Sequence, residues 1–178
     1  MDAFDLLGLP RRPWLEPNDV RAAFQRRARE LHPDSVAGDA EAFARLNAAY
    51  GELERPARRL RQLLDGHAVP SVPPDVALGL EIGAALRESG LLLDRWRQAA
   101  SPLTRALMAG DVAAARSRLH FLVDQVTAQI TTAEARLRSL DAAWPDVPLD
   151  DLAAMAGTLS FFDRWGAQLR DRVTELSA

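Results

Sequence analysis

The residues with the clearest chemical potential form one short motif, His32-Pro33-Asp34. Pro33 fixes its own φ angle and disfavours the helical region for His32, so the motif predicts a turn. Such a turn would hold an imidazole and a carboxylate together at a helix tip facing water. A plain helix stop, with Asp34 or Ser35 binding nearby backbone amides, is the alternative. On the three residues alone, the helix stop is the favoured interpretation.

A basic helix face precedes this motif in residues 17–31. If Phe24 faces a core, Arg26 and Arg29 point the opposite way and Arg21 lies on the flank. Beside a fixed polar turn, such a face could dock on an acidic protein surface, where charge speeds encounter more than it raises affinity. A solvated face without a partner is the ordinary alternative.

The remaining residues do not form a recognisable catalytic or metal-binding pattern. The sequence has no cysteine, which excludes a disulfide scaffold, a thiolate nucleophile and a cysteine zinc site. Its three histidines, His32, His67 and His120, are far apart in sequence. We find no nucleophile elbow, phosphate-binding loop or metal-ligand spacing, so we expect no enzyme, no cofactor and no bound metal. A plain helical scaffold, or a small hydrolase using His32 and Asp34, is the alternative of a different class.

Composition narrows the class of protein further. The chain has 178 residues, 48% of them hydrophobic, which is enough to bury a core. Its 22 basic and 25 acidic residues give a net charge of −3, which argues against binding nucleic acid through bulk positive charge. No apolar run approaches the ~20 residues that span a membrane, and the acidic start lacks the pattern of a signal peptide. We therefore expect a cytoplasmic protein, monomeric, without a nucleic-acid or membrane partner.

The chain is predicted to be helical nearly throughout, because apolar residues recur every three or four positions and β-branched runs are missing. The first part predicts a short helix over 4–7, long helices over 17–31 and 39–53, and a short helix from Pro56. Two long amphipathic helices joined by a short loop should pack antiparallel. The predicted fold class is therefore all-α, beginning with an antiparallel hairpin and two short helices.

A proline-rich stretch, with Pro70, Pro73 and Pro74, separates this part from the rest. Beyond it we predict a three-helix bundle, with helices over about 75–99, 111–142 and 149–176, and Pro102 interrupting the first. Gly79, among other glycines, makes the first of these helices poor in intrinsic propensity, at a cost of about 1 kcal/mol per glycine relative to alanine.

Taken together, the motifs resemble the J-domain of DnaJ-type co-chaperones. The resemblance covers the opening Phe4-Asp5-Leu6-Leu7-Gly8-Leu9, the helix before the motif, the motif itself and the helix after it. More narrowly, the chain resembles the HscB family of bacterial iron–sulfur cluster assembly, in which a J-domain precedes a three-helix domain. The matching pattern comprises Leu46-Asn47, Ala49-Tyr50, Leu53, Pro56, Arg59, Leu63-Leu64, Leu159, Phe161-Phe162-Asp163-Arg164, Leu169 and Leu176.

This resemblance implies a division into a J-domain over 1–66, a linker over 67–75 and a three-helix domain over 76–178. It implies docking on an ATP-bound DnaK-type chaperone, HscA in this family, whose ATP hydrolysis is triggered while the J-protein itself does no chemistry. The resemblance implies that the trigger consists of His32, Pro33 and Asp34. It implies that the docking charge comes from Arg21, Arg26 and Arg29.

The resemblance also implies an apolar client surface for the iron–sulfur scaffold protein IscU, involving Leu80, Phe161 and Trp165. Phe161 and Trp165 lie one turn apart on the last helix. Filling of the bundle core is the alternative for these residues. The first helix of the second part also departs from the family, because glycine and alanine replace much of its acidic character. A divergent J-protein that delivers a different client is thus the second hypothesis.

Overall fold

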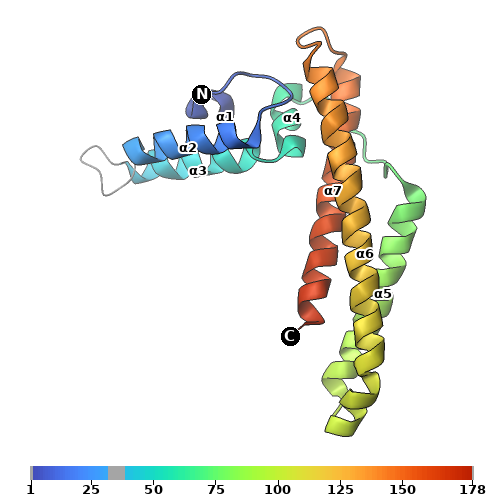
Figure 1. The fold of residues 1–178 in the computed structure, drawn as a ribbon. Coiled ribbons are helices and arrows are strands. Elements are labelled where there is room, and N and C mark those ends of the chain that lie inside the picture. Colours follow the sequence, from blue (N-terminus) through green and yellow to red (C-terminus); the bar gives the residue numbers. More distant parts are fainter. Residues whose placement is uncertain (1, 32–38, 178) are drawn as a thin grey trace. The chain divides into compact units, whose positions relative to one another are not determined.

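The structure is a computed structural model that describes residues 2–31 and 39–177 (Figure 1). The described residues form α-helices and no strand, which confirms the all-α prediction. None of the described helices is long and apolar enough to cross a membrane. The helices are α1 Ala3–Leu7, α2 Pro17–Leu31, α3 Ala40–Leu53, α4 Pro56–Leu64, α5 Val76–Gln98, α6 Pro102–Asp141 and α7 Leu149–Glu175.

The chain forms two compact units, and each is built from two separate stretches of sequence. Unit 1 comprises Met1–Ser71 and Ala133–Ser160, and unit 2 comprises Val72–Thr132 and Phe161–Ala178. Helices α6 and α7 therefore contribute to both units. The division into domains over 1–66, 67–75 and 76–178 stays a prediction.

Unit 1 begins with a short helix that its own side chains cap. The carboxylate of Asp2 accepts a hydrogen bond from the backbone N–H of Asp5 at 2.9 Å, and the Asp5 carboxylate accepts one from the N–H of Asp2 at 3.2 Å. Gly8 ends α1 in the left-handed region, with φ of 65°, where a side chain would be strained. The predicted end of this helix at residue 7 is confirmed.

Helices α2 and α3 form the predicted antiparallel hairpin (Figure 1). Asp39 caps α3, because its side chain accepts hydrogen bonds from the second and third backbone N–H groups of the helix at 2.9 and 3.1 Å. Val20 of α2 and Leu46 of α3 are buried, while the rings of Phe24 and Tyr50 pack with centroids 4.5 Å apart. The hairpin thus holds the predicted basic face of α2 on a rigid support.

The core of unit 1 also includes the end of α6 and the start of α7. Leu137 of α6 and Leu152 of α7 are fully buried in the same cluster as Phe4 and Leu60. The first 71 residues therefore share their apolar core with a segment that follows more than sixty residues later.

Unit 2 packs α5 against the first part of α6 and the last part of α7. Its core contains Leu78 and Ile82 from α5, Leu119 and Leu122 from α6, and Leu169 from α7. The bundle is therefore held mainly by apolar contacts among three helices, as the leucine-rich spacing predicts.

One predicted boundary in unit 2 is wrong. We expected the middle helix to begin near Asp111, but α6 begins at Pro102. Proline is well tolerated at the first helical position, because its missing N–H would have no partner there. The Ser101 hydroxyl supports this start by accepting a hydrogen bond from the N–H of Thr104 at 3.1 Å. Pro102 thus starts α6, and α5 has already ended at Gln98.

Candidate functional site

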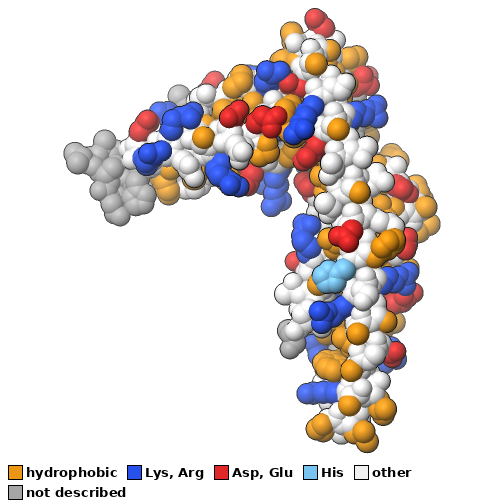
Figure 2. All heavy atoms as spheres, in the orientation of Figure 1, with side chains coloured by type: hydrophobic (Ala, Val, Ile, Leu, Met, Phe, Trp, Pro, Cys, Tyr) orange, Lys and Arg blue, Asp and Glu red, His pale blue; other side chains and the backbone are white. Residues whose placement is uncertain are grey.

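The basic face of α2 is exposed to solvent. Arg21, Arg26 and Arg29 are all exposed, and Figure 2 shows basic side chains along the α2–α3 hairpin with acidic ones between them. The Nε of Arg29 donates to the carbonyl of Gln25 at 3.2 Å. The Arg26 side chain makes no hydrogen bond or ion pair with any other residue that the structure describes. At least one of these guanidinium groups is thus available to an anionic partner.

Arg21 lies beside a tyrosine of the neighbouring helix. The hydroxyl of Tyr50 donates to the Glu54 carboxylate at 2.8 Å, and this bond is the main reason why the pKa of Tyr50 is raised above its ordinary value. Burial and the charge of Glu54 raise this pKa further, while Arg21 lowers it. The base of the arginine face is therefore connected to α3 by polar contacts as well as by aromatic packing.

The motif His32-Pro33-Asp34 lies outside the described residues. In the sequence it stands between Leu31, where α2 ends, and Asp39, which caps α3. The role of these three residues stays a prediction, as does the docking role of Arg21, Arg26 and Arg29.

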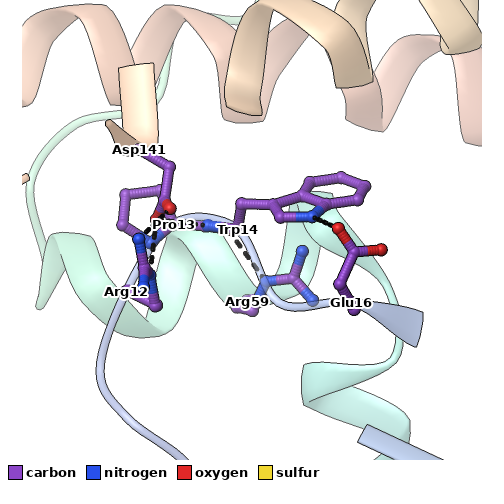
Figure 3. Close-up of polar contacts among 6 residues, drawn as sticks. All are labelled: Arg12, Pro13, Trp14, Glu16, Arg59 and Asp141. Carbon is purple, nitrogen blue, oxygen red and sulfur yellow. Dashed lines mark hydrogen bonds and ion pairs between the residues drawn. The ribbon is translucent and has the colours of Figure 1, made fainter. Parts of the chain in front are cut away.

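A buried polar cluster in unit 1 was not predicted from the sequence (Figure 3). Arg59 of α4 is 1% exposed, and its guanidinium donates to two carbonyls at 2.9 Å, those of Pro13 and Leu53. Its second terminal nitrogen has no hydrogen-bond partner. The arginine thus links α4 to the end of α3 and to the loop before α2.

Asp141, at the end of α6, is the acidic member of this cluster. Its carboxylate accepts a hydrogen bond from the backbone N–H of Trp14 at 2.9 Å and forms an ion pair with the guanidinium of Arg12 (Figure 3). The Trp14 indole donates to Glu16 at 2.8 Å, and the Arg138 guanidinium lies 4.4 Å from its ring centroid. The loop between α1 and α2 is therefore anchored to the end of α6.

The electrostatics of the cluster follow from its burial. Desolvation lowers the pKa of Arg59 to about 10, although the charges of Asp141 and Glu134 oppose this change. The hydrogen bond and the charge of Asp141 raise the pKa of Arg12 above its ordinary value. The carboxylate of Asp141 thus favours the charged form of both guanidinium groups.

The residues predicted to bind a client lie in unit 2 and differ in exposure. Leu80 is 70% exposed, whereas Phe161 and Trp165 are partly buried, with ring centroids 5.8 Å apart. Trp165 packs on Gly79, where an added Cβ would lie 2.9 Å from the indole. Leu80 therefore directly follows the residue on which Trp165 packs. Their client-binding role stays a prediction.

Metal ligation has no support in the described part of the chain. Within residues 2–31 and 39–177, no group of three or more histidine, cysteine, aspartate or glutamate side chains could hold a metal ion. His67 instead contacts the Asp150 carboxylate through Nε2 at 2.9 Å, and His120 is exposed on α6.

The N-terminal segment matches a known domain family. Residues 2–61 match the family model of the DnaJ domain. This segment is a DnaJ domain. It contains the α2–α3 hairpin, the three exposed arginines and the motif His32-Pro33-Asp34.

Curated relatives support the same assignment over a similar stretch. The chain is 39% identical over 75 residues to a chaperone protein DnaJ of Roseiflexus sp. (strain RS-1), which is 41% of this chain and 20% of that protein. It is 36% identical over 70 residues to the chaperone protein DnaJ of Caldicellulosiruptor saccharolyticus, which is 38% of this chain and 18% of that protein. The chain thus spans about a fifth of the length of these relatives, and the likeness concerns the DnaJ domain.

The likeness to a solved structure extends over the whole fold. The chaperone HscB from Vibrio cholerae superposes with a TM-score of 0.59, covering 96% of this chain and 96% of that chain at 21% sequence identity. The combination of a DnaJ domain with C-terminal helices in the HscB arrangement confirms the fold predicted from the sequence.

The buried cluster extends beyond the matched DnaJ domain. Arg12, Trp14 and Arg59 belong to residues 2–61, whereas Asp141 comes from α6. The sequence contains one weak signal of this arrangement, namely a basic residue, Arg59, between leucines on the apolar side of α4. Nothing in the spacing of Asp141 indicates its partners, because they lie 127 and 129 residues away.

Proposed function

We propose that this protein is a co-chaperone that stimulates ATP hydrolysis by a DnaK-type chaperone, and more narrowly by a chaperone of the HscA type. The observation that carries the proposal is the DnaJ domain with an exposed arginine face on α2, directly before His32-Pro33-Asp34. The partner would carry out the hydrolysis, and this chain would act as its activator and not as an enzyme.

The proposed roles follow from the chemistry of the residues. Arg26 and Arg29, with Arg21 at their side, would steer the domain toward an acidic surface of the chaperone, since exposed charges act mainly on the association rate. His32 and Asp34, held by Pro33, would then make the short-range polar contacts that trigger hydrolysis. A positive face without neutralising partners suits such an encounter, and Arg26 has none among the described residues.

A steady-state ATPase assay with the cognate DnaK-type chaperone tests this proposal. We expect His32→Gln to abolish the stimulation of ATP hydrolysis at every concentration of this protein. Arg26→Glu should raise the concentration needed for half-maximal stimulation about tenfold, because it replaces attraction with repulsion. Arg58→Ala is the matched control, since Arg58 is exposed on α4 of the same domain and pairs with Glu52 at 3.3 Å. Equal stimulation by the parent and by His32→Gln would remove the mechanism.

We further propose that unit 2 holds the client, a scaffold protein of the IscU type, on the surface around Leu80, Phe161 and Trp165. Two observations support this part: the HscB-like fold of the chain, and the 70% exposure of Leu80, which directly follows the Gly79 on which the partly exposed Trp165 packs. Partly exposed aromatic rings are enriched in protein-binding surfaces. The complex would act in the cytoplasm, with one copy of this chain per client.

Binding of purified IscU-type scaffold, measured by calorimetry, tests the client surface. Phe161→Ala and Leu80→Ser should each weaken binding at least tenfold, as expected for residues at the centre of an interface. Leu91→Ser serves as the control, because Leu91 is 66% exposed on the same helix α5. Equal losses in all three variants would contradict a specific surface, and unchanged binding in Phe161→Ala would place the client elsewhere.

A different client is the second candidate function. The observation that favours it is the low acidic content of α5. Before Asp94, this helix has only Glu81 and Glu88 as acidic residues, and Gly79 and Gly83 lie around Glu81. If the chain stimulates the chaperone normally but does not bind an IscU-type scaffold, the DnaJ-domain mechanism holds and the client changes.

A further inference from the structure

The three-helix unit has an open end, where α7 stops before the α5–α6 hairpin does (Figure 1). A cavity of about 520 Å³ lies at this end, between the last turn of α5, the first part of α6 and the final residues of α7. This volume falls within the range of ~300–1,000 Å³ typical of ligand-binding pockets.

The cavity has an apolar floor. Leu93 of α5 and Leu176, directly after α7, are buried, while Trp96 and Val112 are partly exposed. A partly exposed indole beside buried aliphatic side chains offers a large contact area that loses little conformational freedom on binding. The floor is therefore suited to a bulky apolar group.

The rim of the cavity is positively charged. Arg97 and Arg105 both line it, and neither forms an ion pair with another residue that the structure describes. Arg105 donates from Nε to the carbonyl of Ala99 at 3.1 Å, which holds its guanidinium at the rim. The acidic residue at the rim, Glu175, is neutralised by Arg172 at 2.9 Å. An anionic group would therefore be favoured here.

Two further apolar side chains lie near this end of the hairpin, on the face of α6 turned away from Arg105. Leu103 and Leu107, one turn apart on α6, are 70% and 77% exposed. Figure 2 shows hydrophobic side chains gathered at this end of the hairpin. A small molecule in the cavity would leave these leucines in water, whereas a peptide segment that continues from the cavity around the start of α6 could cover them. The observations therefore favour a polypeptide occupant.

We propose that this end of unit 2 binds a peptide segment of a partner protein, in which a bulky apolar side chain is flanked by carboxylates. The apolar side chain enters the cavity over Trp96, and the carboxylates pair with Arg97 and Arg105. The site is separate from the proposed client surface around Phe161 and from the arginine face of α2. Its existence does not depend on chaperone activation.

Fluorescence anisotropy of a labelled synthetic peptide on the full chain tests the proposal. The probe is a short amphipathic peptide with leucine and phenylalanine on one helical face and glutamates on the other. We expect binding that weakens with salt and is lost when glutamine replaces every glutamate. Arg97→Glu should lower the affinity about tenfold, and Arg105→Gln should lower it by a smaller factor. Arg116→Glu, an exposed change on α6 that does not line the cavity, should bind as the parent does.

Three results would overturn the proposal. Equal affinities of the parent and Arg97→Glu would show that the rim charges do not recognise the peptide. Full displacement of the peptide by decanoate at equimolar concentration would identify a small-molecule pocket instead. A dimer in light scattering that dissociates in Leu107→Ser would assign the exposed leucines to contacts between two copies of this chain. Because the assay contains no chaperone and no scaffold protein, its outcome is independent of the proposed co-chaperone activity.

Discussion

The two compact units of this protein are stabilised internally by different kinds of interaction. Unit 1 combines an apolar core with a buried arginine, Arg59, and a buried carboxylate, Asp141. Unit 2 has an apolar core in which glycines let side chains of α7 approach α5 closely. Substitutions should therefore act through unpaired polar groups in unit 1 and through local packing in unit 2.

The contrast is clearest where distant segments meet. In unit 1 the loop before α2 reaches Asp141 through directed hydrogen bonds to a backbone N–H and a guanidinium. In unit 2 the indole of Trp165 packs on Gly79, where an added Cβ would lie 2.9 Å from the ring. The hydrogen bonds in unit 1 fix the relative position of the segments that they join. In unit 2 the missing side chain of a glycine allows two helices to approach closely.

The largest effect is expected from the acidic residue of the cluster. Asp141→Ala removes the acceptor of the Trp14 N–H and the countercharge of Arg12, and it takes away the larger of the two carboxylate charges that oppose the desolvation of Arg59. We expect the free energy of unfolding to fall by about 2–3 kcal/mol, mainly because the buried N–H of Trp14 loses its acceptor. Urea unfolding followed by circular dichroism measures this loss. Asp146→Ala, an exposed change in the following turn, is the control. Similar losses of stability in both variants would show that the polar contacts of Asp141 do not stabilise unit 1.

A smaller loss is expected from a glycine in unit 1. At Gly157 of α7 an added Cβ would lie 2.6 Å from the carbonyl oxygen of Pro70. Backbone atoms cannot move aside cheaply, so Gly157→Ala should cost about 1–2 kcal/mol even after its gain in helix propensity. The same urea experiment checks this value. A stabilised variant would mean that the stretch around Pro70 is not fixed against α7.

Two glycines of unit 2 provide a matched pair. Gly110 lies in open space in α6, whereas an added Cβ at Gly79 would lie 2.9 Å from the ring of Trp165. Gly110→Ala should raise the free energy of unfolding by about 1 kcal/mol through helix propensity alone. Gly79→Ala should raise it less or lower it, because the indole must move. Equal gains would show that the packing of Trp165 on Gly79 contributes nothing.

The smallest effect is expected at Tyr50, whose pKa is raised in the folded state mainly by the hydrogen bond to Glu54. The unfolded chain therefore releases this proton first, so the contribution of Tyr50 is complete below its ordinary pKa near 10 and declines as the pH rises above it. Tyr50→Phe should cost about 0.5–1 kcal/mol at pH 7. Its stability should also fall less steeply than that of the parent above pH 10. Thermal unfolding over this pH range distinguishes the two slopes, and parallel curves would contradict the assignment.

Much of the helical framework could be predicted from local patterns. Leucines and prolines at regular positions predicted both ends of α2 and α3 and the start of α4 closely, because caps and periodicity act within a few residues. The start of α6 was misplaced because proline can either end a helix or begin one. The choice depends on what lies before it, and here the Ser101 cap decides for a beginning.

The residues of the candidate sites also differ in whether local patterns could predict them. The exposure of Arg21, Arg26 and Arg29 followed from helix geometry once Phe24 was assigned to the inner side of α2. The pairing of Asp141 with Arg12 could not be inferred, because it depends on how segments 129 residues apart meet in the folded chain. The fit of Gly79 to Trp165 likewise appears only when α5 and α7 are placed together.

The anchoring of Trp14 and Arg12 by Asp141 has a consequence for protein engineering. The DnaJ domain is a natural candidate for exchange between chaperone systems, since the recognition surface that we propose lies on one hairpin. In this chain a transplanted domain would also have to supply a guanidinium and a backbone N–H in register with the α6 carboxylate. Chimeras that keep residues 11–16 of this chain and replace only the hairpin should fold more readily than whole-domain swaps.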